Sequence, residues 1–347
     1  MKEKWLMLTT IPGLEETAQD EAIEKIHPSK YKIRPENIKG RLSIKISEKH
    51  LEKTLRLRSI EYIILLLKTF RVDNTRKALE TIYQNMYNTS LQQLGPSFRI
   101  TCERIGKHQY TSIDVQKTAG QAVVDRYGTK VDLEKPDTII RVDVIHNTCI
   151  IGTLLNHQPL HIRYKRIFHH PSALNPIIAY AMLRSTKIQP QDKILDAFCG
   201  GGTILIEALQ NWENIETVGL DINEKYIKGA TLNADMAHIN KKNLRLIVGN
   251  ACKLEKFLPS EWKPNKVISN LPFGIRSGRK KTIPNIYKDF LTSLKTVLAP
   301  ENKICLLTTH NRLLKNIADQ LGYNIIKEQQ ILYGGLTCWI IQLTLLR

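Results

Sequence analysis

The sequence predicts an α/β protein whose C-terminal part is a Rossmann-like domain with a parallel sheet and a closing antiparallel hairpin, preceded by α+β domains. Three observations predict this fold. From Pro171 onward, short apolar runs typical of buried strands alternate with amphipathic helical segments. The residues before that point form two smaller α+β patterns, the first of roughly β-α-β-α-β type. The chain has 347 residues, which is too long for one ordinary domain and suits two or three.

The alternating part predicts its elements in order. We expect strands at 193–198, 217–222, 244–249, 266–271 and 303–308. We expect helices at 175–184, 203–210, 224–238, 286–298 and 311–321. Residues 323–346 predict the hairpin, which turns at Tyr333-Gly334-Gly335. Strand–helix alternation of this length implies a parallel sheet with helices on both faces, and ligands then bind at the carboxyl ends of the strands.

The part before Pro171 predicts two smaller α+β domains. The first contains a helix whose apolar residues recur at helical spacing, namely Leu14, Ala18, Ala22 and Ile26. The second contains a helix with one apolar face, formed by Val115, Ala119, Ala122 and Val123. Two strands around His146-Asn147 complete it as a hairpin. We expect domains at 1–74, 75–155 and 173–347, with a basic surface linker at 156–172.

Charge is the most unusual feature of the composition. Lys and Arg total 51 against 33 Asp and Glu, a formal net charge of +18. Such an excess attracts a polyanion, and phosphate backbones are the usual one. A basic but inert surface, common where an AT-rich genome favours codons for Lys and Ile, is the competing explanation.

Cysteine spacing and hydropathy argue against zinc-binding, disulfide-stabilised, secreted and membrane-spanning proteins. The six cysteines lie far apart, and none forms a C-x-x-C pair, which argues against a zinc site and a disulfide framework. The N-terminus lacks the apolar stretch of a signal peptide, and the longest apolar runs are too short to span a bilayer. We therefore expect a cytoplasmic protein without a metal and without a membrane partner. Independently of these observations, we expect a monomer.

The strongest motif is the segment DAFCGGGT at 196–203, where a strand ends and a glycine turn opens a helix. A dinucleotide fingerprint would need glycine where Leu205 stands, and a phosphate-binding loop would need a lysine after the glycines. Asp196 would repel a pyrophosphate but attract an ammonium and a sulfonium. S-adenosylmethionine carries both, so we expect it as the cofactor. Taken alone, the glycine triplet would favour the simpler interpretation of a tight turn.

The next two strands also end in polar residues. Asp221 follows the second strand, where a carboxylate accepts hydrogen bonds from both ribose hydroxyls, and Ile222 can cover the adenine. The alternative is that Asp221 caps the helix that follows. After the third strand, Asn250 can meet the adenine amino group. The expected cofactor contacts are Asp196, Phe198, Gly200, Gly201, Gly202, Thr203, Asp221, Ile222, Asn223, Asn250, Ala251 and Asn270.

The fourth strand ends in Asn270-Leu271-Pro272-Phe273-Gly274, close to the [DN]-P-P-[YF] motif of amino-group methyltransferases but with Leu271 in place of the first proline. An aryl amine is a poor nucleophile because its lone pair is delocalised into the ring. Acceptors for its N–H groups, here Asn270 Oδ1 and the Leu271 carbonyl, stabilise the positive charge that develops during attack. Pro272 fixes the loop and Phe273 can stack on the base. An ordinary strand-to-loop turn is the competing interpretation.

At this point the chain resembles the THUMP-domain RNA methyltransferases, specifically the branch that forms N2-methylguanosine at position 6 of tRNA. The resemblance covers nearly the whole chain. It rests on the order of several segments, namely 98–100, 104–108, 131–133, 136–137, 166–171, 174–176, 270–274, 278–280 and 334–336. It implies a class I methyltransferase domain, a ferredoxin-like domain at 1–74, and a THUMP domain at 75–155 that positions tRNA. The first RNA-binding candidates are Arg99, Arg104, Lys107 and Arg166, each of which is equally explained as a solvated charge.

Three alternatives stay open. The first is a related enzyme acting on guanosine 10 of tRNA or on a ribosomal guanine. The second is an adenine-N6 DNA methyltransferase, which shares the Asn270 chemistry but would not normally carry a THUMP module. The third is a non-catalytic RNA-binding protein with a degenerate methyltransferase domain, against which Asp196, Asp221 and Asn270 argue.

Overall fold

The computed structural model describes residues 3–274 and 282–346. The chain forms two compact units. The N-terminal unit comprises Met1–Thr10 and Glu15–Leu160, and the C-terminal unit comprises Ile11–Leu14 and His161–Arg347. Within the described ranges, no helix is long and apolar enough to cross a membrane.

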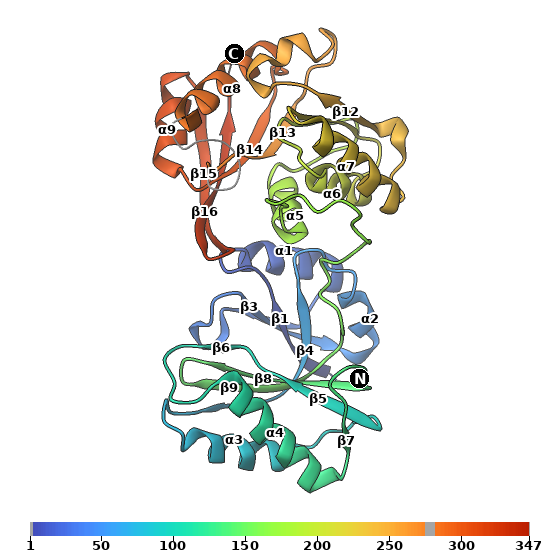
Figure 1. The fold of residues 1–347 in the computed structure, drawn as a ribbon, viewed down its shortest axis with the longest axis vertical. Coiled ribbons are helices and arrows are strands. Elements are labelled where there is room, and N and C mark those ends of the chain that lie inside the picture. Colours follow the sequence, from blue (N-terminus) through green and yellow to red (C-terminus); the bar gives the residue numbers. More distant parts are fainter. Residues whose placement is uncertain (1–2, 275–281, 347) are drawn as a thin grey trace. The chain divides into compact units, whose positions relative to one another are not determined.

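The N-terminal unit is built on one mixed sheet (Figure 1). Its strands pair in the order β2-β3-β1-β4-β9-β8-β5-β7, with β6 beside β8. The strands are β1 (Glu3–Thr9), β2 (Lys30–Ile33), β3 (Arg41–Ser47), β4 (Tyr62–Arg71), β5 (Ser97–Thr101), β6 (Arg104–Ile105), β7 (Lys130–Val131), β8 (Thr138–Ile145) and β9 (Thr148–Leu154). The helices are α1 (Glu15–Ile26), α2 (Leu51–Thr54), α3 (Ala78–Tyr87) and α4 (Ser112–Tyr127). Antiparallel pairing of β4 with β9 therefore joins the two α+β patterns into a single sheet.

The two predicted helices bury the faces that the spacing predicts. Ala18, Ala22 and Ile26 of α1 pack into one core, and Val115 and Ala119 lie among the buried residues of the α4 core. Leu14 differs, because it precedes α1 and packs in a core of the C-terminal unit. The turn that carries it is held there by the Leu332 N–H, which donates to the Pro12 carbonyl at 3.0 Å.

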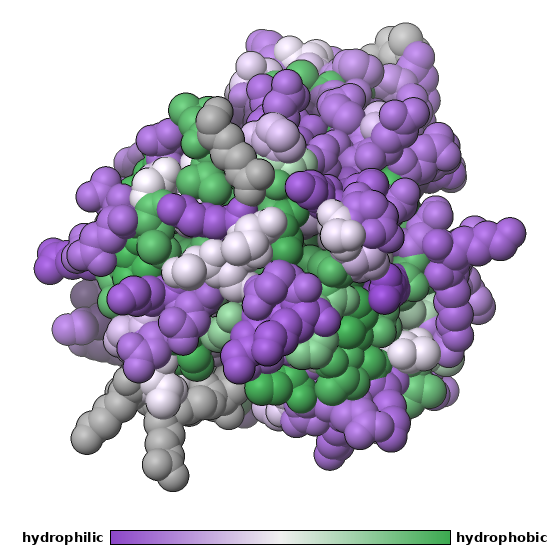
Figure 2. Space-filling model, turned by 90° about the horizontal axis from the view of Figure 1, so that it is seen from above, coloured by the Kyte–Doolittle hydropathy of each residue, from purple (hydrophilic) through white to green (hydrophobic). Residues whose placement is uncertain are grey.

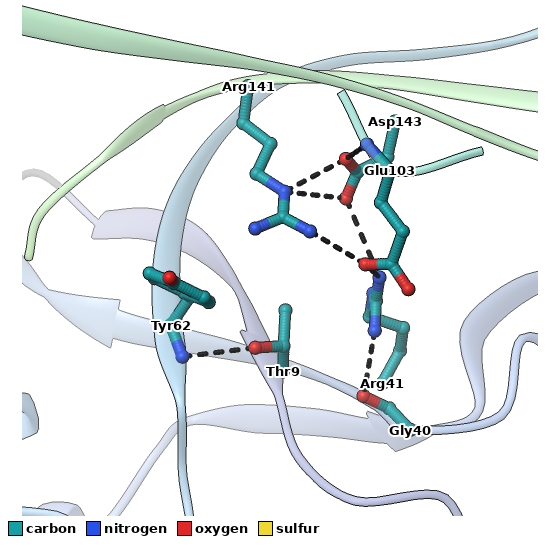
Figure 3. A network of polar contacts seen from close by, with 7 residues as sticks. All are labelled: Thr9, Gly40, Arg41, Tyr62, Glu103, Arg141 and Asp143. Carbon is teal, nitrogen blue, oxygen red and sulfur yellow. Dashed lines mark hydrogen bonds and ion pairs between the residues drawn. The ribbon is translucent and has the colours of Figure 1, made fainter. Parts of the chain in front are cut away.

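A partly buried ionic network ties the strands of the two N-terminal patterns together (Figure 3). Glu103 Oε2 accepts hydrogen bonds from Arg41 Nη2 of β3 and Arg141 Nη2 of β8, each at 2.6 Å. Arg141 Nε also donates to Asp143 Oδ1 at 2.8 Å. The two arginines are each paired with a carboxylate, and this pairing offsets the cost of removing the charges from water.

The C-terminal unit has the predicted parallel sheet with a closing antiparallel hairpin. Its strands pair in the order β12-β11-β10-β13-β14-β16-β15. The strands are β10 (Lys193–Asp196), β11 (Glu216–Asp221), β12 (Leu244–Val248), β13 (Lys266–Asn270), β14 (Lys303–Thr308), β15 (Asn324–Tyr333) and β16 (Leu336–Thr344). The helices are α5 (Pro176–Ser185), α6 (Thr203–Asn211), α7 (Glu224–Met236), α8 (Ile283–Val297) and α9 (Asn311–Gln320). The carboxyl ends of β10 to β14 share one edge, where the predicted motifs stand.

Hydrophilic residues cover most of the face shown in Figure 2, with apolar residues exposed in patches between them. On the C-terminal unit, the exposed large apolar side chains include Ile222, which is 73% exposed at the end of β11. An apolar side chain standing free beside a polar loop is suited to cover a flat ligand ring.

Candidate cofactor and methyl-transfer site

The glycine turn between β10 and α6 adopts a backbone that only glycine adopts easily. Gly200 has φ +51° and Gly202 has φ +80°, both in the left-handed region. The turn is closed by the Gly202 N–H, which donates to the Cys199 carbonyl at 2.8 Å. These glycines thus shape the loop that follows Asp196, as the motif predicts for a close backbone approach to a ligand.

Asp196 ends β10 almost entirely buried, at 1% exposure. Its Oδ1 accepts hydrogen bonds from the Ser269 hydroxyl at 2.9 Å and from the Phe198 N–H at 3.2 Å. Burial raises the pKa of the Asp196 carboxyl to about 7, and the charge of Asp221 adds to the rise. A buried carboxylate without a cation is costly, so this position suits a positively charged ligand group.

Asp221 lies across the glycine turn at the end of β11. Its Oδ2 accepts from the Gly200 N–H at 3.1 Å, and its Oδ1 accepts from the Asn223 N–H at 2.9 Å. The helix α7 is capped by Asn223, whose Oδ1 accepts from the Lys225 N–H at 3.0 Å. Asp221 is therefore not the cap of this helix, and its half-buried carboxylate keeps lone pairs for a ligand.

Asn250 follows β12 and already has a local partner. Its Oδ1 accepts from the Cys252 N–H at 2.9 Å and caps the short helical turn that begins at Ala251. A carbonyl oxygen has a second lone pair, and the amide NH₂ group carries two donors. The predicted contact with an adenine is compatible with this cap.

The segment after the N-terminal unit packs against the glycine turn, where the sequence predicts a surface linker. Asn233 of α7, 2% exposed, accepts from the N–H groups of Ile167 and Phe168 at 3.1 and 3.0 Å. Its Nδ2 donates to the Gly201 carbonyl at 3.1 Å. The Phe168 ring fills the space beside Gly229, where a Cβ would lie 2.2 Å from Phe168 Cγ. Residues 161–172 are thus partly built into the site.

His170 also belongs to this cluster. Its ring lies over Gly200, where a Cβ would be 3.5 Å from His170 Cδ2, and its edge meets the Tyr226 ring at 4.2 Å between centroids. Burial lowers the pKa of the His170 imidazole, while the nearby Asp221 raises it. Asn233, Phe168 and His170 have no pattern of their own in the sequence that marks them as neighbours of the loop.

The loop after β13 carries the proposed acceptors. Leu271 is 1% exposed, and its N–H donates to the Leu307 carbonyl of β14 at 3.0 Å. Asn270 Oδ1 is buried and has no hydrogen-bond partner among the described residues. An orphaned buried acceptor costs free energy that a ligand N–H can recover. The Phe273 ring is partly buried against the core of the unit, and the family-like residues at 278–280 lie outside the described ranges.

The RNA-binding candidates fall on both units. In the N-terminal unit, Arg99 Nη1 donates to the Leu133 carbonyl, Arg104 Nη1 donates to the Gly106 carbonyl, both at 3.1 Å, and Lys107 is exposed. In the C-terminal unit, Arg166 Nη2 reaches Thr203 Oγ1 at 3.3 Å, at the start of α6. Arg166 is thus engaged with the glycine loop's helix. Among the described residues, no group of three or more His, Cys, Asp or Glu could hold a metal ion.

Parallel strands that end in a buried acid, a glycine turn, a second acid and an amide-bearing loop define a class I methyltransferase with S-adenosylmethionine as its methyl donor. Comparison with known proteins agrees. Residues 163–338 match the family model "RMKL-like, methyltransferase domain", and residues 71–154 match that of the THUMP domain. The chain therefore belongs to the THUMP-containing family of RMKL-like methyltransferases, which confirms the resemblance predicted from the sequence.

Individual relatives resemble the chain to different extents. A tRNA (guanine(6)-N2)-methyltransferase of Methanocaldococcus jannaschii is 31% identical over 97% of this chain and 99% of its own length. The crystal structure of TrmN from Thermus thermophilus has a TM-score of 0.84 and 27% identity, covering 99% of this chain and 100% of that chain. A tRNA (guanine(10)-N2)-dimethyltransferase of Methanothermobacter thermautotrophicus is 30% identical but matches only 59% of this chain and 61% of its own.

Proposed function

We propose that this protein transfers a methyl group from S-adenosylmethionine to N2 of guanosine 6 in tRNA. The observation that carries the proposal is Asn270 Oδ1, which is buried and has no hydrogen-bond partner among the described residues, at the carboxyl edge of the sheet that also bears Asp196 and Asp221. An acceptor without a donor fits a substrate amine that brings N–H groups. The match to the Methanocaldococcus jannaschii guanine(6) enzyme over nearly the full length supports the choice of base.

Different residues of the site would bind different parts of the cofactor. Asp221 would accept hydrogen bonds from the ribose hydroxyls, and Ile222, whose side chain is exposed, would cover one face of the adenine. Asp196 would balance the positive charge of the methionine end, directly or through water. When bound, S-adenosylmethionine supplies an electrophilic methyl group on a sulfonium. Arg99, Arg104, Lys107 and Arg166 are the proposed RNA contacts, although Arg166 also lies beside the cofactor loop.

Asn270 and Leu271 act on the guanine amine. Their acceptor oxygens bind its two N–H groups, favour a pyramidal nitrogen and stabilise the positive charge that grows there. The alkylated nitrogen is strongly acidic, so it loses its proton without a strong base. Pro272 fixes the loop and Phe273 stacks on the base. Most of the rate then comes from holding amine and methyl group in line.

The partner is tRNA, and the excess of 51 basic over 33 acidic residues supplies the charge to bind it. We expect the protein to act as a monomer in the cytoplasm. A guanosine-10 substrate is the second candidate, favoured by the partial match to a guanine(10) dimethyltransferase.

Inosine lacks the exocyclic amine and therefore tests the substrate directly. Two tRNA transcripts with inosine replacing either guanosine 6 or guanosine 10 are incubated with enzyme and labelled cofactor. Label should enter the transcript substituted at position 10 and not the one substituted at position 6. The reverse pattern would assign the chain to guanosine 10, and label in neither or both would contradict both assignments.

A further inference from the structure

Two consecutive backbone carbonyls of the loop after β13 are held by side chains that the proposed chemistry does not use. The Tyr287 hydroxyl of α8 donates to the Pro272 carbonyl at 3.0 Å. His310 Nε2, on the residue that precedes α9, lies 3.0 Å from the Phe273 carbonyl. A carbonyl can only accept, so the proton of this hydrogen bond is on Nε2.

Thr308 at the end of β14 joins these two donors. Its Oγ1 accepts from the His310 N–H at 2.8 Å and lies 2.9 Å from the Tyr287 oxygen. Because the Tyr287 proton is committed to Pro272, the Thr308 hydroxyl donates to Tyr287. Tyr287 and Thr308 are both fully buried at 0% exposure, and burial raises the pKa of Tyr287 to about 12, so its hydroxyl stays a donor.

The Pro272 and Phe273 carbonyls are occupied by these hydrogen bonds, whereas two other acceptors of the loop are not. The Leu271 N–H is bound by Leu307, and the Leu271 carbonyl accepts no hydrogen bond from the described part of the chain. Asn270 Oδ1 is also unpartnered among those residues. A primary amine offers two N–H groups, which matches these two acceptors in number.

We infer that Tyr287, Thr308 and His310 form a carbonyl clamp that binds the Pro272 and Phe273 carbonyls and so holds the loop with Asn270 Oδ1 and the Leu271 carbonyl as the amine-binding pair. The three are positioning residues, since Tyr287 and His310 contact the loop, Thr308 joins those two, and none of the three is proposed to touch the substrate. The inference rests on the proposed function for what the pair binds, but the clamp itself is a property of the protein alone.

The test compares two tyrosines that each donate from a buried hydroxyl. Tyr287→Phe removes the donor to Pro272. Tyr323→Phe is the matched control, because the Tyr323 hydroxyl donates at 2.7 Å to the Leu291 carbonyl of the same helix α8 and not to a carbonyl of the loop. Single-turnover methyl transfer, cofactor affinity and amide hydrogen exchange of the peptide containing Leu271 are measured for both.

The clamp predicts that Tyr287→Phe lowers the single-turnover rate about tenfold or more, with cofactor affinity unchanged. Exchange at the Leu271 peptide should quicken, since the loop is freed. Tyr323→Phe should leave both unchanged. His310→Gln, which keeps a donor, should retain more of the rate than His310→Ala.

Unaltered exchange of the Leu271 peptide in Tyr287→Phe would overturn the clamp, whatever the substrate is. Suppose that the wild-type protein methylates and that exchange quickens in Tyr287→Phe. If the methyl-transfer rate of Tyr287→Phe then equals that of Tyr323→Phe, the role of the clamp in positioning the acceptors is overturned. If the wild-type protein methylates no guanine amine, the proposed function fails, and the exchange result still decides the clamp.

Discussion

The carboxylate of Asp221 accepts a hydrogen bond from the backbone N–H of Gly200 at 3.1 Å, which ties the end of β11 to the glycine turn after β10. One side chain therefore both shapes the loop and presents the proposed ribose acceptors. Substitutions of Asp221 should therefore lower the affinity for the cofactor more than they lower the rate of methyl transfer from bound cofactor.

Asp221→Ala should weaken S-adenosylmethionine binding by ~2–3 kcal/mol, because acceptors for two ribose hydroxyls are lost. Calorimetry measures the affinity. Asp221→Asn, which can still accept from Gly200, separates loss of the ribose contacts from distortion of the turn and should give an intermediate affinity. Asp235→Ala on α7, whose carboxylate pairs with Lys241, is the surface control. Unchanged affinity in Asp221→Ala would remove this residue from the site.

Asn270→Ala should keep cofactor and tRNA binding but lose about a hundredfold or more of the methyl-transfer rate, because one acceptor at the developing charge is gone. Single-turnover kinetics with saturating cofactor report the chemical step. Asn324→Ala, at the exposed start of β15, is the matched control. A rate near that of the control would exclude Asn270 from catalysis.

Cofactor affinity should rise with pH through the neutral range. The Asp196 carboxyl has a pKa of about 7 in the free protein, raised from 3.8 by burial, so it is largely protonated below that pH. A sulfonium and an ammonium favour the carboxylate, and binding therefore strengthens as the proton leaves. Asp196→Asn should abolish this dependence. Wild-type affinity that is flat between about pH 6 and pH 8 would contradict a cation beside Asp196.

The same raised pKa affects folding with the opposite sign. Between the unfolded value of 3.8 and about 7, the folded protein holds this proton more tightly than the unfolded chain does. The contribution of Asp196 to stability is therefore largest at low pH and is lost as pH rises toward about 7. Thermal unfolding of Asp196→Asn, compared with wild type across this range, isolates the contribution.

Lys107→Ala should weaken tRNA binding and reduce the slope of log affinity against log salt by about one, because one phosphate contact releases one counterion fewer. Lys107 is exposed on the N-terminal unit, after β6. Lys315→Ala, whose ammonium already pairs with Glu328 at 2.9 Å, is the control. An unchanged slope would mean that Lys107 is a solvated charge.

The amine of guanosine 6 lies in a paired stem, whereas Asn270 Oδ1 is buried at the end of a sheet. The base must therefore leave the stack to react. A mismatch opposite guanosine 6 lowers the cost of unpairing and should maintain or speed methylation. The family resemblance implies that the N-terminal domains recognise the tRNA 3′ end, and docking of that end would offset the unpairing cost. Removal of the 3′ end should therefore cripple methylation. Normal rates on the truncated tRNA would contradict docking through the 3′ end.

Local patterns were sufficient to predict the parallel sheet and the residues at its carboxyl edge. The strand predicted at 266–271 is β13 (Lys266–Asn270), and the helix predicted at 224–238 is α7 (Glu224–Met236). The helix α8 begins at Ile283, earlier than predicted, because Pro284 fits a first helical turn, where its missing N–H has no partner to lose.

Tertiary contacts explain what the sequence could not predict. The single sheet of the N-terminal unit depends on pairing of β4 with β9. The hydrophobic pattern of a strand does not indicate which other strand it pairs with. Phe168 beside Gly229 and Asn233 under the glycine turn are close only after folding. The same holds for Tyr287 and His310, which come from separate elements and meet on one loop.

Mapping the methylated nucleoside tests the central claim most directly. A tRNA transcript is incubated with the protein and S-adenosylmethionine, cut into fragments by a base-specific nuclease, and analysed by mass spectrometry. The account predicts N2-methylguanosine in the acceptor-stem fragment, at position 6, and far less of it in the same time with Asn270→Ala. Product at guanosine 10, on another base, or absent altogether would contradict it.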